Sequence, residues 1–266
     1  MKQIIDVAEY NTIVDTYWRD GVLSNDYLQK DVPYLVSNGI LYVDCYENNV
    51  FFFVLRDAGI RIYYYINNLN ESVDFSNYND LVVEILFRNN IPYNELNFFV
   101  DKGFKQNLIR DQYSGLYKDL KLVNSISSEF DVGAAISYEE VKKACELFNS
   151  SFDKLSGDFL PETRYQELFD SGKILVVRDK TKNHLLGALH QDKEGTVNIL
   201  RHVAVVEQAR GLGVGKAILS AFIESNHIDE KTRYMLWVQR QNEAAVNMYK
   251  NVGFKFLNKS TVSLIK

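Results

Sequence analysis

The segment VAVVEQARGLGVGK, residues 203–216, decides how this chain folds and what it can hold. An apolar run ends near Val206, glycines follow at 211, 213 and 215, and a helical apolar pattern begins at once. Glycine reaches positive φ and lets a ligand approach the backbone. A helix N-terminus adds unpaired N–H groups and the positive end of the dipole. The segment therefore predicts a strand, a tight loop and a helix that bind a phosphate.

Two common phosphate loops are excluded by their spacing. In a Walker loop, Arg210 would stand where the first glycine belongs and Ala217 where Ser or Thr belongs. In the dinucleotide fingerprint, Lys216 or Ile218 would stand where the third glycine belongs. The phosphate ligand must therefore be of another kind.

Around this loop, short apolar runs alternate with helical patterns. The expected strands are Ile174–Val177, Leu185–His190, Val197–Val206, Tyr234–Val238, Lys255–Leu257 and Val262–Ile265. Helices are expected after Ser137 and after Gly213, a short helix is expected to have Pro161 at its first position, and a last helix runs through Ala245 to Gly253. Ser137 and Glu140 form an S-x-x-E capping box for the first helix. This order predicts an α/β (α+β) fold with a mixed sheet flanked by helices.

The end of the first half of the chain resembles the end of the second half. Residues 97–105 (NFFVDKGFK) match residues 247–255 (NMYKNVGFK) at an offset of 150. Strands are expected upstream at Ile40–Val43, Val50–Leu55, Ile60–Ile66 and Leu81–Phe87. We therefore expect two domains, 1–122 and 137–266, joined by the polar segment 122–137. The halves are either copies of one fold, or the first is an unrelated α+β domain.

A second motif lies downstream of the glycine loop. Gln208 to Gly213 fits the pattern Q/R-x-x-G-x-G/A, and Asn242, Ala245, Tyr249 and Gly253-Phe254 follow at fixed spacing. Over residues 137–266 the chain resembles the GNAT superfamily of N-acetyltransferases. The resemblance implies a GNAT-type mixed, twisted sheet, and two tandem GNAT-like halves if the repeat is real. It also implies transfer of an acetyl group from acetyl-CoA to a primary amine by direct attack.

The resemblance assigns roles to residues of the second half. It implies a cofactor site on the strand, the loop and the next helix: Val203, Val205, Gln208, Arg210, Gly211, Leu212, Gly213, Val214, Gly215, Lys216 and Asn242. Tyr249 is the expected general acid for the leaving thiolate, and the alternative is a core aromatic. His202 is the expected general base, although a strand histidine is often structural and Arg201 precedes it. Asn242 also suits a helix N-cap, and Arg210 and Lys216 also suit a solvated surface.

The first half is expected to lack this machinery. Phe99 stands at the position of Tyr249, and nothing near Ala58-Gly59 resembles the glycine loop. If it is a GNAT-like copy, it is degenerate and shapes the acceptor site. Two rival functions stay open for the chain: a non-catalytic acyl-CoA sensor and a scaffold whose aromatic first half binds a partner.

Composition limits the partners. The 266 residues carry 30 basic and 35 acidic side chains, a net charge of −5 that argues against a nucleic-acid partner. Cys45 and Cys145 lie in no ligand spacing, so neither a metal site nor a disulfide is expected. No signal peptide or membrane-spanning apolar run is present, so we expect a cytoplasmic protein without a membrane partner.

The resemblance implies that the acceptor is a small-molecule amine or a peptide amine. In the family it is set by the segment corresponding to Ser150–Leu160, and Asp153, Asp158 and Asp170 would suit a cationic amine. The oligomeric state is open.

Overall fold

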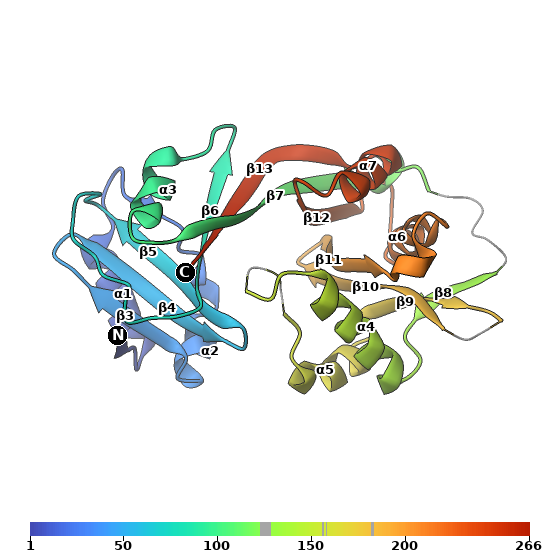
Figure 1. Ribbon diagram of the computed structural model, residues 1–266, viewed down its shortest axis with the longest axis horizontal. Helices are drawn as coiled ribbons and strands as arrows, with labels where there is room; N and C mark the ends of the chain where they lie inside the picture. Colours follow the sequence, from blue (N-terminus) through green and yellow to red (C-terminus); the bar gives the residue numbers. More distant parts are fainter. Residues whose placement is uncertain (123–128, 156, 158, 182–183) are drawn as a thin grey trace. The chain divides into compact units, whose positions relative to one another are not determined.

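The computed structural model describes residues 1–122, 129–155, 157, 159–181 and 184–266. The chain divides into two compact units. The N-terminal unit comprises Met1–Ile109 with Lys259–Lys266, and the C-terminal unit comprises Arg110–Asn258. Each unit contains strands flanked by helices (Figure 1) and has its own hydrophobic core.

The C-terminal unit is built on six strands in the order β7-β12-β11-β10-β9-β8. Their bounds are β7 Lys105–Leu116, β8 Phe130–Ala134, β9 Ile174–Asp179, β10 Leu185–Glu194, β11 Val197–Val205 and β12 Arg233–Gln239. Of β7, Arg110–Leu116 pairs with β12. Neighbouring strands are antiparallel except β11 and β12, which are parallel.

Helices cover both faces of this sheet. They are α4 Tyr138–Ser151, α5 Tyr165–Asp170, α6 Val214–Ser225 and α7 Glu243–Val252. On one face, α4 and α5 pack on Val176 and Ala188, and on the other α6 packs on Val177 and Leu189 (Figure 1). Alternate residues of one strand point to opposite faces, so β9 and β10 each contribute side chains to the core on both sides of the sheet. Burial here supplies the main stabilisation of the unit.

The first turn of α4 is held by polar contacts, of which the capping box of Ser137 and Glu140 was predicted from the sequence. Ser137 Oγ accepts a hydrogen bond from the Glu140 N–H at 3.3 Å, as a capping box requires. The Glu140 carboxylate accepts from the N–H of Ile136 at 2.8 Å, one residue earlier than the simple box predicts. The same carboxylate accepts from the buried Arg178 guanidinium at 2.6 and 2.8 Å. Arg178 also contacts Asp131, so it joins β8, β9 and α4.

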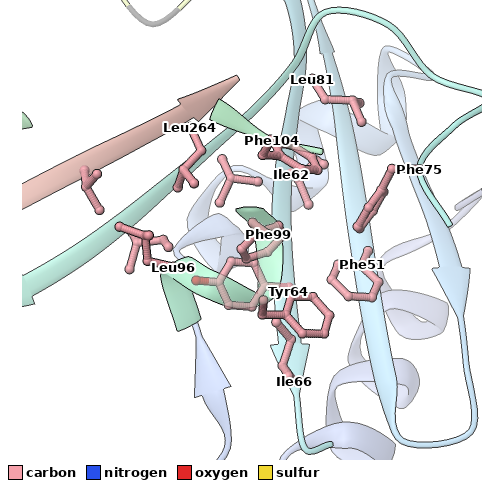
Figure 2. Close-up of a cluster of buried hydrophobic side chains, with 14 of the residues drawn as sticks. Phe51, Ile62, Tyr64, Ile66, Phe75, Leu81, Leu96, Phe99, Phe104 and Leu264 are labelled. Atoms are coloured by element: carbon pink, nitrogen blue, oxygen red, sulfur yellow. The ribbon is translucent and has the colours of Figure 1, made fainter. Parts of the chain in front are cut away.

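The N-terminal unit repeats this plan. Its strands run in the order β1-β3-β4-β5-β6-β13, and β2 pairs with β5. Their bounds are β1 Lys2–Gln3, β2 Leu23–Ser24, β3 Leu41–Cys45, β4 Asn49–Arg56, β5 Gly59–Ile66, β6 Leu81–Arg88 and β13 Lys255–Ile265. The helices are α1 Val7–Tyr17, α2 Val32–Ser37 and α3 Tyr93–Val100. Figure 2 shows the aromatic core formed by Phe51, Tyr64, Phe75, Phe99 and Phe104.

The two units share one topology. In both, two antiparallel pairings are followed by one parallel pairing, β5 with β6 and β11 with β12. The helices α3 and α7 then begin 150 residues apart, at Tyr93 and Glu243. The described residues 67–80 between β5 and β6 contain no helix, whereas α6 lies between β11 and β12. The predicted mixed sheet with two similar halves is confirmed, and the first half lacks the helix that follows the glycine loop.

Three details of the sequence prediction were wrong. Strand β8 lies inside the predicted linker, because its mixed residues form a strand only by pairing with β9. The two predicted last strands are one strand, β13, in which Asn258 takes a φ of 55°. Pro161 precedes a short 3-10 helix, Glu162–Arg164, that leads into α5.

The unit boundaries also differ from the expected domain ranges. Arg110–Leu116 pairs with β12, and Lys259–Ile265 pairs with β6. The last strand of each half is therefore part of the unit formed mainly by the other half. None of the helices in the described ranges is long and apolar enough to cross a bilayer.

Candidate functional site

The glycine loop joins β11 to α6 through the short 3-10 helix Glu207–Ala209. Gly211 and Gly213 have φ of +80° and +87°, and a Cβ at either position would meet open space. These two glycines are required by backbone conformation, since L side chains rarely adopt such angles. Gly215 is different, because its Cβ would lie 3.2 Å from Met248 Sδ. It lets α6 pack closely on α7.

The N-terminus of α6 forms the end of this loop. The first intrahelical bond runs from the Ala217 N–H to Gly213 O at 3.0 Å. The N–H groups of Val214, Gly215 and Lys216 precede it and point along the helix axis away from the helix, where an anion binds. The Lys216 and Arg210 side chains are exposed beside them. The side chain of Val214 is buried, so Val214 can contact a ligand only through its backbone.

Gln208 and Leu212 lie on the outer side of the loop. Both line a cavity of about 1100 Å³ that Lys143 and Arg178 also border. The loop thus has open space beside it as well as at its helix end.

A split opens between the parallel strands β11 and β12. Their register runs from Val197↔Arg233 to Leu200↔Leu236. Beyond this point β11 continues to Val205 and β12 to Gln239. A bulge at Arg201 marks the start of the split, because His190 pairs with His202 while Gln191 pairs with Leu200. The half-buried Val203 and Val205 lie on the diverging part of β11.

Helix α7 brings Asn242 and Tyr249 into the same unit. Asn242 caps α7, and its side chain accepts from the Ala245 N–H at 3.1 Å, as the alternative interpretation predicted. Tyr249 is 4% exposed and packs edge-on against Phe254 at 6.0 Å between ring centroids. Burial raises the pKa of the Tyr249 hydroxyl, so it carries its proton at neutral pH. Tyr249 is therefore a core aromatic, and its role as an acid stays a prediction.

His202 belongs to a buried pair that the sequence did not reveal. Its Nδ1 lies 3.2 Å from Nδ1 of His190, and its ring lies against Phe148 of α4 and against Phe152. Burial, and next the proximity of His202, lower the pKa of His190 to about 3. The signal that could have revealed His190 is the β10–β11 register, which sets it opposite His202.

Arg201 is engaged elsewhere. Its guanidinium lies 2.5 Å from the Glu194 carboxylate and 3.4 Å from that of Asp192. Of the two candidates for a base, His202 is the one that faces α4 and the start of the α4–α5 segment. Its catalytic role stays a prediction.

Two of the three acidic candidates near the acceptor segment fall within the described residues. Asp153 and Asp170 are exposed, and Asp158 lies outside the described residues. Within the described ranges, no group of three or more His, Cys, Asp or Glu side chains is placed to hold a metal ion.

Three features together indicate the class of protein: a split between parallel strands, a bulge at its start and a glycine loop at its end. The protein is an acyltransferase with the GNAT fold. Residues 170–256, which lie within the C-terminal unit, match the family model of the acetyltransferase (GNAT) domain.

Solved structures have the same fold over most of the chain. A GNAT-family acetyltransferase from Colwellia psychrerythraea is 15% identical, with a TM-score of 0.55 over 99% of this chain and 98% of that one. A GCN5-related N-acetyltransferase from Sphaerobacter thermophilus is 10% identical, with a TM-score of 0.57 over 82% and 76%. A tandem GNAT protein from the clavulanic acid biosynthesis pathway is 10% identical, with a TM-score of 0.53 over 85% and 83%. A search of curated proteins found no match.

Proposed function

We propose that the C-terminal unit transfers an acetyl group from acetyl-CoA to a primary amine by direct attack. The observation that carries the proposal is the split of β11 from β12, followed in the chain by two glycines of positive φ and the N-terminus of α6. Coenzyme A has a pyrophosphate at one end of a long amide-bearing arm. The loop suits the pyrophosphate, and the backbone N–H and C=O groups of the diverging strands suit the amides.

The loop would hold the pyrophosphate mainly through backbone groups. The N–H groups around Gly213 and the α6 dipole favour a dianion, and exposed Arg210 and Lys216 add positive charge. Val203 and Val205 on β11 would flank the amide arm, and Asn242 at the start of α7 lies in the same family motif. An N–H of the diverging part of β11 would then stabilise the oxyanion of the tetrahedral intermediate.

Two side chains would move protons. The attacking amine must be neutral, and His202 would remove a proton from it, directly or through water. With both rings neutral, donation of Nδ1–H from His202 to Nδ1 of His190 directs the basic lone pair of His202 to Nε2. Tyr249 would donate its proton to the leaving thiolate, for which its raised pKa keeps it protonated. Phe152, which contacts His202, lies in the segment Ser150–Leu160 that is expected to set the acceptor.

Calorimetric titration with acetyl-CoA tests the donor. We expect one binding event that Gly213→Glu abolishes, because the new carboxylate lies where the phosphates bind. Gly195→Glu is the matched control, since Gly195 also has positive φ and open space but lies in the β10–β11 turn. Equal loss in both variants would indicate misfolding, and no binding by the unaltered protein would contradict the proposal.

Tyr249→Phe separates an enzyme from a sensor. In a screen of small amines and peptide N-termini, thiol release measures turnover. We expect kcat to fall by about a hundredfold or more with acetyl-CoA affinity unchanged. Unchanged kcat would remove Tyr249 from the mechanism. Tight binding with no turnover on any amine would favour the sensor.

A further inference from the structure

The N-terminal unit contains a second split between parallel strands. The register of β5 with β6 runs only from Ile60↔Leu81 to Ile62↔Val83. Beyond it β5 continues to Ile66 and β6 to Arg88. In topology this is the place that the β11–β12 split occupies in the C-terminal unit.

The side chain of Asn25 bridges this split. Its Nδ2 donates to the carbonyl of Ile62 on β5 at 3.1 Å and to the carbonyl of Glu84 on β6 at 2.9 Å. Its Oδ1 accepts from the N–H of Tyr64 at 2.9 Å. Asn25 is 4% exposed, so one carboxamide satisfies three backbone groups that the divergence of the strands would otherwise leave unpaired.

The segment that carries Asn25 is firmly held. Leu23 and Ser24 form β2 and pair with Ile66 and Tyr65, on the edge of β5 opposite β4. Next to Asn25, the Asp26 carboxylate accepts hydrogen bonds from the hydroxyls of Tyr10 and Tyr65. Asp26 also accepts from the Leu28 N–H at 2.8 Å. The segment is thus a built part of the unit.

The helix side of the split is filled as well. Glu95 on α3 precedes Ala245 on α7 by 150 residues, so a large side chain stands where the C-terminal unit has a methyl group. The buried Glu95 carboxyl accepts a hydrogen bond from the hydroxyl of Tyr64, which is fully buried. Phe99, the counterpart of Tyr249, lies 5.1 Å from the Tyr64 ring (Figure 2).

We propose that the N-terminal unit has a cofactor slot closed from within by its own chain. The Asn25 carboxamide makes the contacts that an amide of the pantetheine arm would make between diverging strands, and the Tyr64–Glu95 pair fills the space beside it. The chain therefore binds one acyl-CoA, in the C-terminal unit. The assignment of that occupant rests on the proposed function, but the closure of the N-terminal slot rests on the contacts of Asn25.

Hydrogen exchange at the Tyr64 amide tests the closure without any ligand. In the unaltered protein this amide is protected, because it donates to Asn25. Asn25→Ala is expected to speed its exchange about tenfold or more. The matched control is Asn38→Ala, since Asn38 is an exposed asparagine of the same unit whose side chain donates to Tyr34 O and Ser37 Oγ within one helical turn. Equal exchange of Tyr64 in all three proteins overturns the proposal.

Addition of acetyl-CoA gives the second arm, in which hydrogen exchange of the unaltered protein needs no variant and Gly213→Glu gives an additional check. We expect protection within residues 203–216 and 242–249, no change within 60–66 and 81–88, and no residual binding in Gly213→Glu. Protection of 60–66, or binding of one equivalent by Gly213→Glu, overturns the proposal. If the unaltered protein binds no acetyl-CoA, the proposed function fails, and the exchange of Tyr64 alone decides whether the slot is closed.

Discussion

Acid should destabilise the C-terminal unit through His190 in particular. Burial lowers the pKa of this side chain from 6.5 to about 3. The folded pKa lies below the unfolded one, so the unfolded chain binds the proton first as the pH falls. The stabilisation is therefore complete above about pH 6.5 and is lost progressively toward pH 3.

The size of the effect follows from the two pKa values. Between pH 7 and pH 5 the unfolded histidine becomes almost fully protonated, while the folded one stays neutral. The difference in bound protons over this interval lowers the free energy of unfolding by about 2 kcal/mol. The figure depends mainly on the unfolded pKa of 6.5, because the folded pKa of about 3 lies well below pH 5. His190→Gln removes this contribution and keeps a polar side chain beside His202.

Urea unfolding at pH 7 and pH 5 measures the difference. Trp237 lies on β12 and reports on the C-terminal unit, so exposed Trp18 is replaced by Phe in both proteins. We expect His190→Gln to lose about 2 kcal/mol less than its parent between the two pH values. Carboxylates titrate in both proteins and cancel in the comparison. Equal losses would refute the claim that the fold keeps His190 neutral.

Three further changes test the site and its support. Arg178→Met removes the hydrogen bonds that Arg178 donates to the Glu140 carboxylate and to the Ala134 carbonyl. It should lower the free energy of unfolding in urea by about 3 kcal/mol. Asn242→Ala removes the α7 cap and should cost about 1 kcal/mol by the same assay; no change would show that the cap bond carries no stability. Gly213→Ala should lower Tm, since left-handed φ costs about 1 kcal/mol, whereas Gly133→Ala, at a strand position where a Cβ meets open space, should not. Equal Tm values would contradict the conformational reason given for Gly213.

The sequence predicted the elements around the glycine loop because they follow from local chemistry. Gly211 and Gly213 sit at the φ values that the loop needs, and Gly253 ends α7 in the left-handed conformation. Ser137 caps α4 by accepting a hydrogen bond from the N–H of Glu140, three residues further along the chain. Such signals act within a few residues, and no distant part of the chain can override them easily.

Other features depended on partners that are distant in sequence. Asn25 is one polar residue in an irregular segment, and only the divergence of β5 from β6 gives it three backbone partners. His190 became a site residue through the register of β10 with β11. Strand β8 is a strand because β9 offers it an edge. No local pattern carries this information, so the candidate base was predicted without its neighbour.

The course of β7 and β13 decides how the chain can be divided. A fragment ending at residue 122 keeps β6 but loses Lys259–Ile265, and one starting at 137 keeps β12 but loses Arg110–Leu116. Each fragment would expose a bare strand edge, which is a template for aggregation. Each half thus supplies the strand that completes the sheet of the other unit. A cut between the two halves would therefore remove an edge strand from both units, so neither half is an independent piece of chain.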